Sequence, residues 1–399
     1  MIQTETQKIK TIKTVGSICS IKNRFSIAKI ISLSRKISTS FFYFSFTLVV
    51  LILVSSCNPA KRLLDGENLM ASYQVKIDNH SLDKNELENI VKQKPNKAII
   101  RFGNHRYLRF HLWFYNFADI GKPRKYKDWL KRVIGEEPVL LDTFLTKKST
   151  SQLKLFLIKK GFFNSIASDT TIYKHKQAFV TYNLKFGLPY HFRDYDYSIK
   201  DTAILNVLLS ETSKTLIKQG DNYDEFVLEQ ERERITKLLR NNGYYYFLKE
   251  YIYFDADTSL GSREANITLG IKNPEKKNIE TDSIVEGKHE KYYLNNIYIV
   301  PDFVAKQKNK IFQDTVLYLN YYFLFDHKMR YRKRILVQPF FLKEGELYSQ
   351  QNVEETYRLM SNLRAFKFTN VNFEEVKNDS NQHLLNAYLQ LSPSPKQAF

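Results

Sequence analysis

The sequence has little of the chemistry that marks metalloproteins and most enzymes. It holds two cysteines and eight histidines in 399 residues, and the histidines are scattered. Even the closest pair, His105 and His111, has neither the spacing typical of a zinc site nor cysteine partners. The sequence also lacks a Gly-x-Ser-x-Gly elbow, a P-loop and a dinucleotide-binding fingerprint. We therefore expect no bound metal, no cofactor and no catalytic activity.

An apolar segment near the N-terminus is too short to span a membrane comfortably. It runs from Phe41 to Val54, whereas a spanning helix needs about 20 residues. It follows a basic leader and ends in Leu53-Val54-Ser55-Ser56-Cys57, with small residues directly before a cysteine. This arrangement resembles a bacterial lipobox and predicts signal cleavage between Ser56 and Cys57, with lipidation of the Cys57 thiol. The alternative is a buried cysteine after an uncleaved anchor.

Cleavage there would change both the charge and the thiol content of the protein. Residues 1–56, the expected signal peptide or N-terminal extension, hold eight Lys or Arg and one acid, so their loss lowers the formal net charge from +19 to +12. Cys19 would be removed with them, which leaves no thiol free to form a disulfide in an oxidising compartment. The leader is longer than the roughly 15 to 30 residues of a usual signal peptide. Either translation starts downstream or the extension is real.

A stretch from Ala98 to Gly135 mixes basic and aromatic residues without a clear period. Such mixing is typical of surfaces that bind single-stranded nucleic acid. In an exported chain held near phospholipid headgroups, a membrane-proximal surface or a plain core is the better interpretation. We therefore expect no nucleic-acid partner.

A helix followed by a β-hairpin organises the centre of the chain, from Gly220 to Ile271. Asp224 can cap a helix whose apolar residues recur on one face, and Asn242-Gly243 ends it, because glycine adopts the left-handed conformation without a Cβ penalty. The acids of this helix, Glu231 among them, are expected on the wet side beside Arg and Lys. The period then changes to two, which indicates paired strands.

The same unit occurs three times, which predicts tandem small α+β domains. Gly161 takes the place of Gly243 in the first copy, whereas the third copy has Ala365 there and must end its helix differently. Because separate cores unfold largely independently, strain at Gly243 is expected to affect the central domain alone. The expected divisions are a first domain at 57–189 with the basic and aromatic insertion, a second at 190–275, a linker at 276–290, and a third at 291–399 with its own insertion.

The order strand, helix, helix, strand, strand resembles the POTRA (polypeptide-transport-associated) domain. The lipobox and six further motifs are similar to the TamL-type lipoproteins of Bacteroidota, within the BamA/TamA outer-membrane assembly superfamily. The six motifs are Gln93-Lys94-Pro95-Asn96, Leu112-Trp113-Phe114-Tyr115-Asn116, Gly220-Asp221-Asn222-Tyr223, Asn242-Gly243-Tyr244-Tyr245, Gly345-Glu346-Leu347-Tyr348-Ser349 and Ala365-Phe366-Lys367-Phe368.

The resemblance implies a location and partners. It implies a lipid anchor in the outer membrane, with the domains in the periplasm. The implied partners are unfolded outer-membrane β-barrel proteins and a TamB-like envelope-spanning protein. Family members continue from a stretch like Leu391–Gln397 into a transmembrane barrel, whereas this chain stops at Phe399. We therefore expect the POTRA region without a barrel, from a truncated gene, a fragment or a stand-alone lipoprotein.

Strand addition is the binding mechanism that we expect. A free sheet edge offers unpaired N–H and C=O groups to an extended peptide, with affinity from the main chain and low specificity. In POTRA domains the first strand of the hairpin is the edge, so the candidate residues are Lys249, Tyr251, Tyr253 and Asp255. Alternatively, Tyr251 and Tyr253 only cover a sheet face. The competing function is a lipid-anchored cell-envelope enzyme acting on wall or lipid substrates, which needs a cleft of clustered, strongly perturbed titratable groups.

Overall fold

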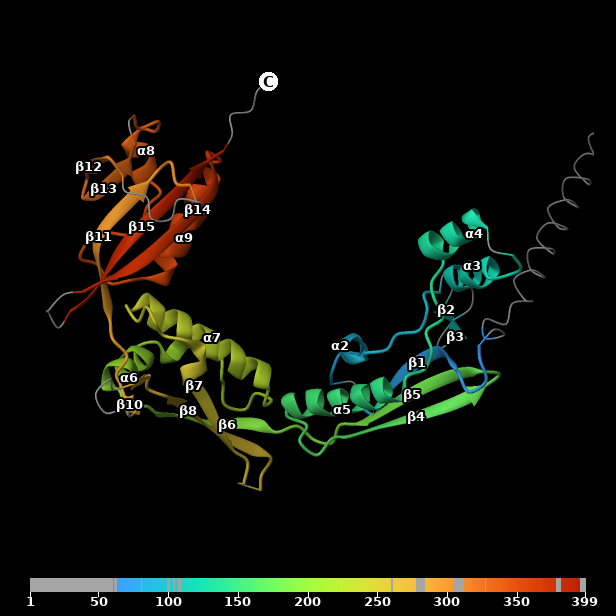
Figure 1. Ribbon diagram of the computed structural model, residues 1–399. Coiled ribbons are helices and arrows are strands. Elements are labelled where there is room, and N and C mark those ends of the chain that lie inside the picture. The colour runs from blue at the N-terminus through green and yellow to red at the C-terminus, as the bar shows by residue number, and fades with distance from the viewer. Residues whose placement is uncertain are drawn as a thin grey trace, which may run out of the picture. The chain divides into compact units, whose positions relative to one another are not determined.

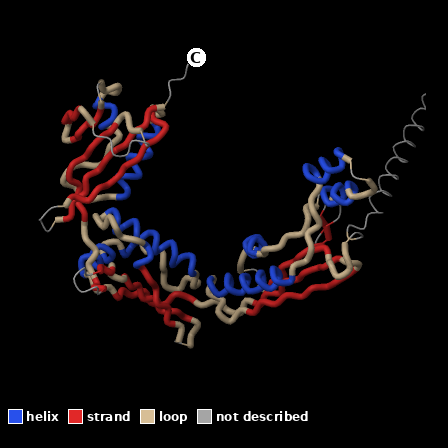
Figure 2. Tube along the Cα trace, in the orientation of Figure 1, coloured by secondary structure: helices blue, strands red, loops and turns tan. Residues whose placement is uncertain are grey.

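The described part of the chain has a mixed α+β structure. The computed structural model describes residue 60 and residues 63–394, apart from 80, 99–100, 103–104, 107–108, 123, 260, 278–283, 305–311, 327 and 378–381. Three βααββ motifs follow one another (Figures 1 and 2), and we call them repeats 1, 2 and 3. The expected α+β class and the tandem βααββ order are confirmed. None of the described helices is both long and apolar enough to cross a membrane. Ser56 and Cys57 lie outside the described residues.

The chain forms two compact units. Unit 1 holds residues 1–153 and 167–185, and unit 2 holds residues 154–166 and 186–399. The sheet of repeat 1 lies in unit 1, and repeats 2 and 3 lie in unit 2. The end of the last helix of repeat 1, with the turn after it, belongs to unit 2.

Repeat 1 shows the common topology. Its sheet has the order β1-β5-β4, and β1 runs parallel to β5. Asp83 caps the first helix by accepting a 2.9 Å hydrogen bond from the Asn85 N–H, which removes one unpaired donor at the helix start. The elements are β1 (Leu69–Ile77), α2 (Lys84–Ile90), α5 (Thr143–Lys159), β4 (Ile166–Lys174) and β5 (Gln177–Lys185).

A long insertion separates the two helices of repeat 1. It spans residues 91–142, whereas the corresponding segments of repeats 2 and 3 are only 210–224 and 338–349. The sequence shows no period here, yet the insertion forms helices of its own. Its elements are β2 (Arg101–Phe102), β3 (His105–Arg106), α3 (Phe110–Ala118), α4 (Lys125–Trp129) and the π-helical turn η1 (Leu130–Ile134).

Repeat 2 has the sheet order β6-β8-β7, with β6 parallel and β7 antiparallel to β8. The alternating residues Ala265, Ile267 and Leu269 of β8 are fully buried, as expected from their period of two. Asp201 and Asp224 cap its helices. The elements are β6 (His191–Ser198), α6 (Thr202–Leu209), α7 (Glu225–Asn241), β7 (Ile252–Asp257) and β8 (Glu264–Ile271).

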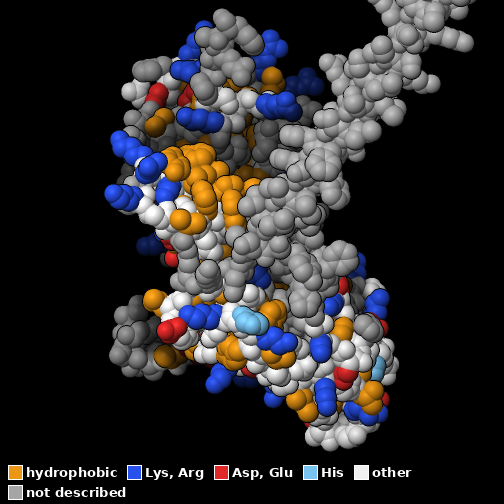
Figure 3. Space-filling view, turned by 90° about the vertical axis from the view of Figure 1, so that its right-hand side faces the viewer, with side chains coloured by type: hydrophobic (Ala, Val, Ile, Leu, Met, Phe, Trp, Pro, Cys, Tyr) orange, Lys and Arg blue, Asp and Glu red, His pale blue; other side chains and the backbone are white. Residues whose placement is uncertain are grey.

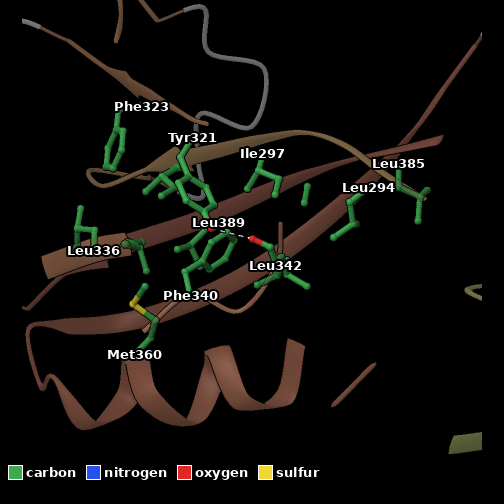
Figure 4. Packing of buried hydrophobic residues seen from close by; sticks show 14 of the residues in the cluster. Leu294, Ile297, Tyr321, Phe323, Leu336, Phe340, Leu342, Met360, Leu385 and Leu389 are labelled. Carbon is green, nitrogen blue, oxygen red and sulfur yellow. Dashed lines mark hydrogen bonds between the residues drawn. The ribbon is translucent and has the colours of Figure 1, made fainter. Parts of the chain in front are cut away.

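Repeat 3 carries an added hairpin that widens its sheet. The order is β12-β13-β11-β15-β14, so the hairpin from the insertion pairs with β11 and covers that edge. Figure 4 shows the core, where Met360 points from its helix into the buried cluster, and the Tyr321 hydroxyl donates to the Leu342 carbonyl at 3.0 Å. The elements are β11 (Tyr292–Val300), β12 (Asp314–Tyr318), β13 (Tyr321–Phe325), α8 (Lys333–Val337), α9 (Gln350–Asn362), β14 (Phe366–Val376) and β15 (His383–Pro393).

The expected linker between repeats 2 and 3 contains secondary structure. The strands β9 (Glu275–Lys277) and β10 (Ile284–Glu286) pair antiparallel as a short hairpin. Beyond it, the His289 ring packs on Phe247 and Tyr251, with ring centroids 4.9 and 4.8 Å apart. This segment therefore packs against the hydrophobic core of repeat 2.

The second helix of every repeat is followed by a residue with positive φ. Gly161 (φ +84°) follows α5 and Gly243 (φ +94°) follows α7, as expected. After α9 this residue is Arg364 (φ 51°), so the expectation that Ala365 takes the place of glycine is wrong by one position. Without a glycine, the sequence does not mark the left-handed position.

Glu231 is buried rather than solvated, which corrects a second expectation. Its side chain is 0% exposed and pairs with Arg234 at 2.8 Å. It also accepts hydrogen bonds from the Thr215 hydroxyl at 2.9 Å and the Leu216 N–H at 3.0 Å. These contacts tie α7 to the loop before it and compensate for the loss of water around the carboxylate.

The same backbone contacts recur at the start of repeats 2 and 3. The Tyr190 N–H donates to the Gly161 carbonyl at 3.0 Å, and the Tyr292 N–H donates to the Gly243 carbonyl at 2.9 Å. The carbonyls of Tyr190 and Tyr292 then accept from Tyr223 at 2.7 Å and Tyr348 at 2.9 Å. We call these two sets of contacts the joints, and each joint lies entirely within unit 2.

Aromatic rings fill both joints in the same way. Phe163 contacts Tyr190 and Tyr223 with ring centroids 4.8 and 5.2 Å apart. Tyr245 contacts Tyr292 and Tyr348 at 6.0 and 4.8 Å. The similar motifs Gly161-Phe162-Phe163 and Gly243-Tyr244-Tyr245 thus have a second role besides ending a helix, because they also join consecutive elements of unit 2.

Candidate functional site

The candidate edge of repeat 2 is placed only in part where the sequence predicts it. Tyr253 and Asp255 lie on β7, which is an edge strand of its sheet. Lys249 and Tyr251 precede the strand, in the 3₁₀ turn η3 (Lys249–Tyr251). The Tyr251 ring packs against Phe247, which anchors this turn to the core and prevents it from extending the edge.

The backbone N–H and C=O groups of β7 that point away from β8 do not belong to the candidate residues Tyr253 and Asp255. The Lys272 N–H donates to the Tyr251 carbonyl at 2.9 Å, which sets the phase of the antiparallel ladder. Because facing pairs alternate between hydrogen-bonded and non-hydrogen-bonded, the groups of Tyr253 and Asp255 face β8. The N–H and C=O groups of Phe254 and Ala256 face outward. These two residues are the ones that the sequence analysis missed, and they follow only once the register is known.

The two faces of β7 differ. Ile252 is buried in the core of repeat 2, and Phe254 packs partly against the same core. Tyr253 lies on the opposite face, where its ring covers Gly270; a Cβ on this glycine would overlap the ring. The Tyr253 side chain therefore covers a sheet face, as the alternative interpretation of this residue expects. Asp255 and Asp257 are exposed beside it.

Side chains from α7 occupy only the start of the edge. Arg232 Nε donates to the Ile252 carbonyl at 3.1 Å, and the guanidinium lies 5.6 Å from the centre of the Phe254 ring. Glu229 pairs with both Arg232 and Lys249, and the Lys249 hydrogen bond lowers the pKa of this carboxyl. Among the described residues, no strand pairs with the outward side of β7 from Phe254 onward.

The equivalent edges of the other repeats are β4 and β14. On β14 the centre is already occupied, because the Val371 N–H donates to the Tyr357 hydroxyl of α9 at 2.8 Å. The same hydroxyl donates to Asn370 Oδ1 at 3.2 Å, which fixes its orientation. The outward side of β7 is therefore less obstructed than that of β14.

Among the described residues, titratable groups with raised pKa values occur in more than one repeat. Burial raises the pKa of Tyr244, in the core of repeat 2, to about 12. Burial also raises the pKa of Tyr388, on the sheet of repeat 3, to about 12. Among the described residues, no group of three or more His, Cys, Asp or Glu could hold a metal ion.

Comparison with known proteins gives matches among solved structures. No family model matches the chain, and no curated protein matches it. The POTRA3-5 region of BamA from Haemophilus influenzae is 10% identical, with a TM-score of 0.36 over 82% of this chain and 99% of that chain. POTRA1-3 of Omp85 from Anabaena is 9% identical, with a TM-score of 0.25 over 83% of this chain and 97% of that chain.

A third match has the same character. The N-terminal domain of Omp85 from Thermosynechococcus elongatus is 12% identical, with a TM-score of 0.25 over 83% of this chain and all of that chain (100%). The first two of these similar structures are POTRA regions. At these identities and TM-scores, the similarity says nothing about activity or partners.

Proposed function

We propose that this chain is the periplasmic POTRA region of an outer-membrane protein assembly or translocation lipoprotein of the BamA/TamA superfamily. It binds unfolded outer-membrane β-barrel proteins by strand addition and docks with a TamB-like envelope-spanning partner. A diacylglycerol on Cys57, exposed by signal cleavage after Ser56, holds it at the outer membrane. The open side of β7, with outward backbone groups at Phe254 and Ala256, carries this proposal.

The geometry of β7 suits a client that is recognised by backbone rather than by sequence. An added strand would pair with the outward N–H and C=O groups and would need no particular side chain at each position. Outer-membrane clients share alternating strands more than they share sequence. The short edge and the acidic residues Asp255 and Asp257 would limit pairing between copies of the chain, because natural edge strands resist aggregation in this way.

A proline variant tests the proposal with little effect on the fold. Ala256→Pro removes an outward N–H and leaves the β7–β8 ladder intact, because proline is tolerated on an edge strand whose N–H faces solvent. Ala256→Ser keeps the N–H and is the matched control. We expect Ala256→Pro to weaken binding of a synthetic alternating-strand peptide at least about tenfold, since it removes a hydrogen bond and adds steric conflict. Equal binding by both variants would refute strand addition at β7.

The competing enzyme function depends on a clustered site. The two groups whose pKa values are raised furthest, Tyr195 and Tyr292, belong to different repeats, and burial is the main cause of both shifts. The scaffold proposal is supported by the open strand edge, which requires no such cluster. Hydrolysis of wall or lipid substrates by the purified protein would favour the enzyme instead.

A further inference from the structure

Helix α3 in the insertion of repeat 1 exposes a face of stacked aromatic rings. Phe110 and Trp113 stack with ring centroids 6.4 Å apart, and Trp113 and Phe117 stack at 5.4 Å. These three side chains are 41%, 38% and 40% exposed. The Phe114 ring contacts two of them, with ring centroids 4.6 Å from Phe110 and 5.0 Å from Trp113. We call Phe110, Trp113 and Phe117 the α3 aromatic face.

The opposite side of the same helix holds it in unit 1. Leu112 is fully buried with Leu69 in a small core cluster, and Ala118 is buried as well. His111 is hydrogen-bonded to the Ile134 carbonyl at 2.8 Å, and its own carbonyl accepts from the Glu136 N–H at 3.1 Å. The helix is therefore fixed by one face, which leaves the aromatic face turned to solvent.

The neighbouring helical segment adds more exposed apolar side chains. Trp129 at the end of α4 and Val133 in η1 are 52% and 64% exposed, and Ile120 between the helices is 52% exposed. Lys131 joins the two segments, because it pairs with Asp119 at 2.8 Å and lies 4.4 Å from the Tyr115 ring centre. Large exposed apolar groups that are gathered in one place mark an interaction surface.

Basic residues border this surface. From Asp119 to Arg132 the chain has six bases and only two acids, Asp119 and Asp128. Figure 3 shows hydrophobic side chains gathered on one face of the molecule, with Lys and Arg side chains beside them. The bases of this stretch are Lys122, Arg124, Lys125, Lys127, Lys131 and Arg132.

We propose that the α3 aromatic face, together with Trp129 and Val133, inserts into the headgroup region of an anionic phospholipid membrane. Trp and Phe prefer the boundary between headgroups and acyl chains, and Lys and Arg pair with anionic headgroups. The βααββ fold does not require the added segment at residues 91–142, since repeats 2 and 3 connect their helices through much shorter segments. The surface acts independently of the Cys57 lipid. With that lipid, it supplies the second signal that a stable membrane anchor needs.

Tryptophan fluorescence reports on this surface alone, because the chain has two tryptophans, Trp113 and Trp129, and both lie in it. The test uses the full chain carrying Cys57→Ala, so that no acyl chain contributes. Vesicles of phosphatidylethanolamine and phosphatidylglycerol are compared with vesicles of phosphatidylcholine. We expect the anionic vesicles to shift the emission to the blue, and brominated phosphatidylglycerol to quench it. Added salt should weaken both effects.

Variants separate the aromatic and basic contributions. We expect Trp113→Ser with Phe117→Ser to weaken partitioning to anionic vesicles at least about tenfold, because each side chain loses apolar burial. Lys122→Glu with Lys125→Glu, both exposed, should weaken it without affecting the core. The matched controls in unit 2 are Leu317→Ser, at a side chain that is 59% exposed, and Lys218→Glu.

The results of the vesicle experiments can be told apart from the results of the peptide-binding test of β7. Emission that is unchanged by anionic vesicles would overturn the membrane proposal, even if β7 binds peptides. An equal loss of partitioning in the unit 2 controls would overturn it too. Capture of a protein on the aromatic face, with no partitioning to vesicles, would assign the surface to a protein partner and contradict our inference.

Discussion

The Leu347 side chain occupies the space directly beside Gly243, so that a Cβ on this glycine would lie only 2.7 Å from Leu347 Cδ2. Gly243 ends a helix of repeat 2, and Leu347 lies in the loop before the last helix of repeat 3. The carbonyl of the same glycine accepts the hydrogen bond from Tyr292. The expectation that strain at Gly243 affects the central domain alone therefore does not fit the contacts.

We predict that Gly243→Ala destabilises repeats 2 and 3 together. The alanine would be strained at positive φ and would also push against Leu347, with a combined cost of about 2 to 4 kcal/mol. Gly220→Ala is the matched control, because Gly220 also has positive φ (+86°) but nothing lies within 4 Å of its added Cβ. It should cost about 1 kcal/mol. Urea unfolding combined with hydrogen exchange measures both; loosening restricted to repeat 2 would contradict the role of the joint.

Arg364→Gly should stabilise repeat 3. Arg364 is held at φ 51°, a conformation that costs an L-residue about 1 kcal/mol and glycine almost nothing. The greater freedom of glycine in the unfolded chain offsets part of this gain. Ala365→Gly, one residue along, has no such strain to relieve and should destabilise by up to about 1 kcal/mol. Destabilisation by Arg364→Gly as well as by Ala365→Gly, measured by thermal unfolding, would show that Arg364 is unstrained.

Glu231→Gln should cost far more than the same change at Glu229. Glu231 is fully buried and its removal leaves Arg234 without its charge partner, which typically costs about 3 kcal/mol or more. The Glu229 side chain is 40% exposed, and ion pairs of this kind contribute about 1 kcal/mol at most. Denaturant unfolding of the two variants gives the comparison. Equal losses would mean that Glu231 is solvated in solution.

Acidification should weaken the segment that carries His289. Burial lowers the pKa of His289, although the hydrogen bond to the Lys272 carbonyl and the charges of Asp201 and Glu290 oppose this. Because the unfolded chain binds the proton more readily, stability is full above the unfolded pKa of about 6.5 and is lost as the pH falls toward the folded pKa. His289→Gln should reduce the loss between neutral and mildly acidic pH. An unchanged pH profile would exclude His289 as its source.

Local sequence signals predicted much of the fold. The capping residue Asp224, the glycines Gly161 and Gly243, and the alternating strands lie where short-range rules place them. Arg364 was missed because no residue type marks a strained left-handed position. The pairing of β13 with β11, which adds the β12–β13 hairpin to the sheet, depends on contacts between distant segments, which no local pattern encodes.

Two misses had different causes. Glu231 lies three residues after Leu228 and four before Ile235, so its spacing places it on the buried face, but its charge suggested solvent. The outward residues Phe254 and Ala256 could not be found from sequence, because a shift of register by one residue exchanges the outward and inward groups.

Hydrogen exchange at the amides of Phe254 and Ala256 tests strand addition most directly. In the free protein both amides face away from β8 and should exchange quickly, whereas those of Tyr253 and Asp255 are protected by the ladder. Adding an alternating-strand peptide should slow exchange at Phe254 and Ala256 at least about tenfold and change Tyr253 and Asp255 little. Unchanged exchange at Phe254 and Ala256 with the peptide bound would contradict the central claim, because binding would then use another surface.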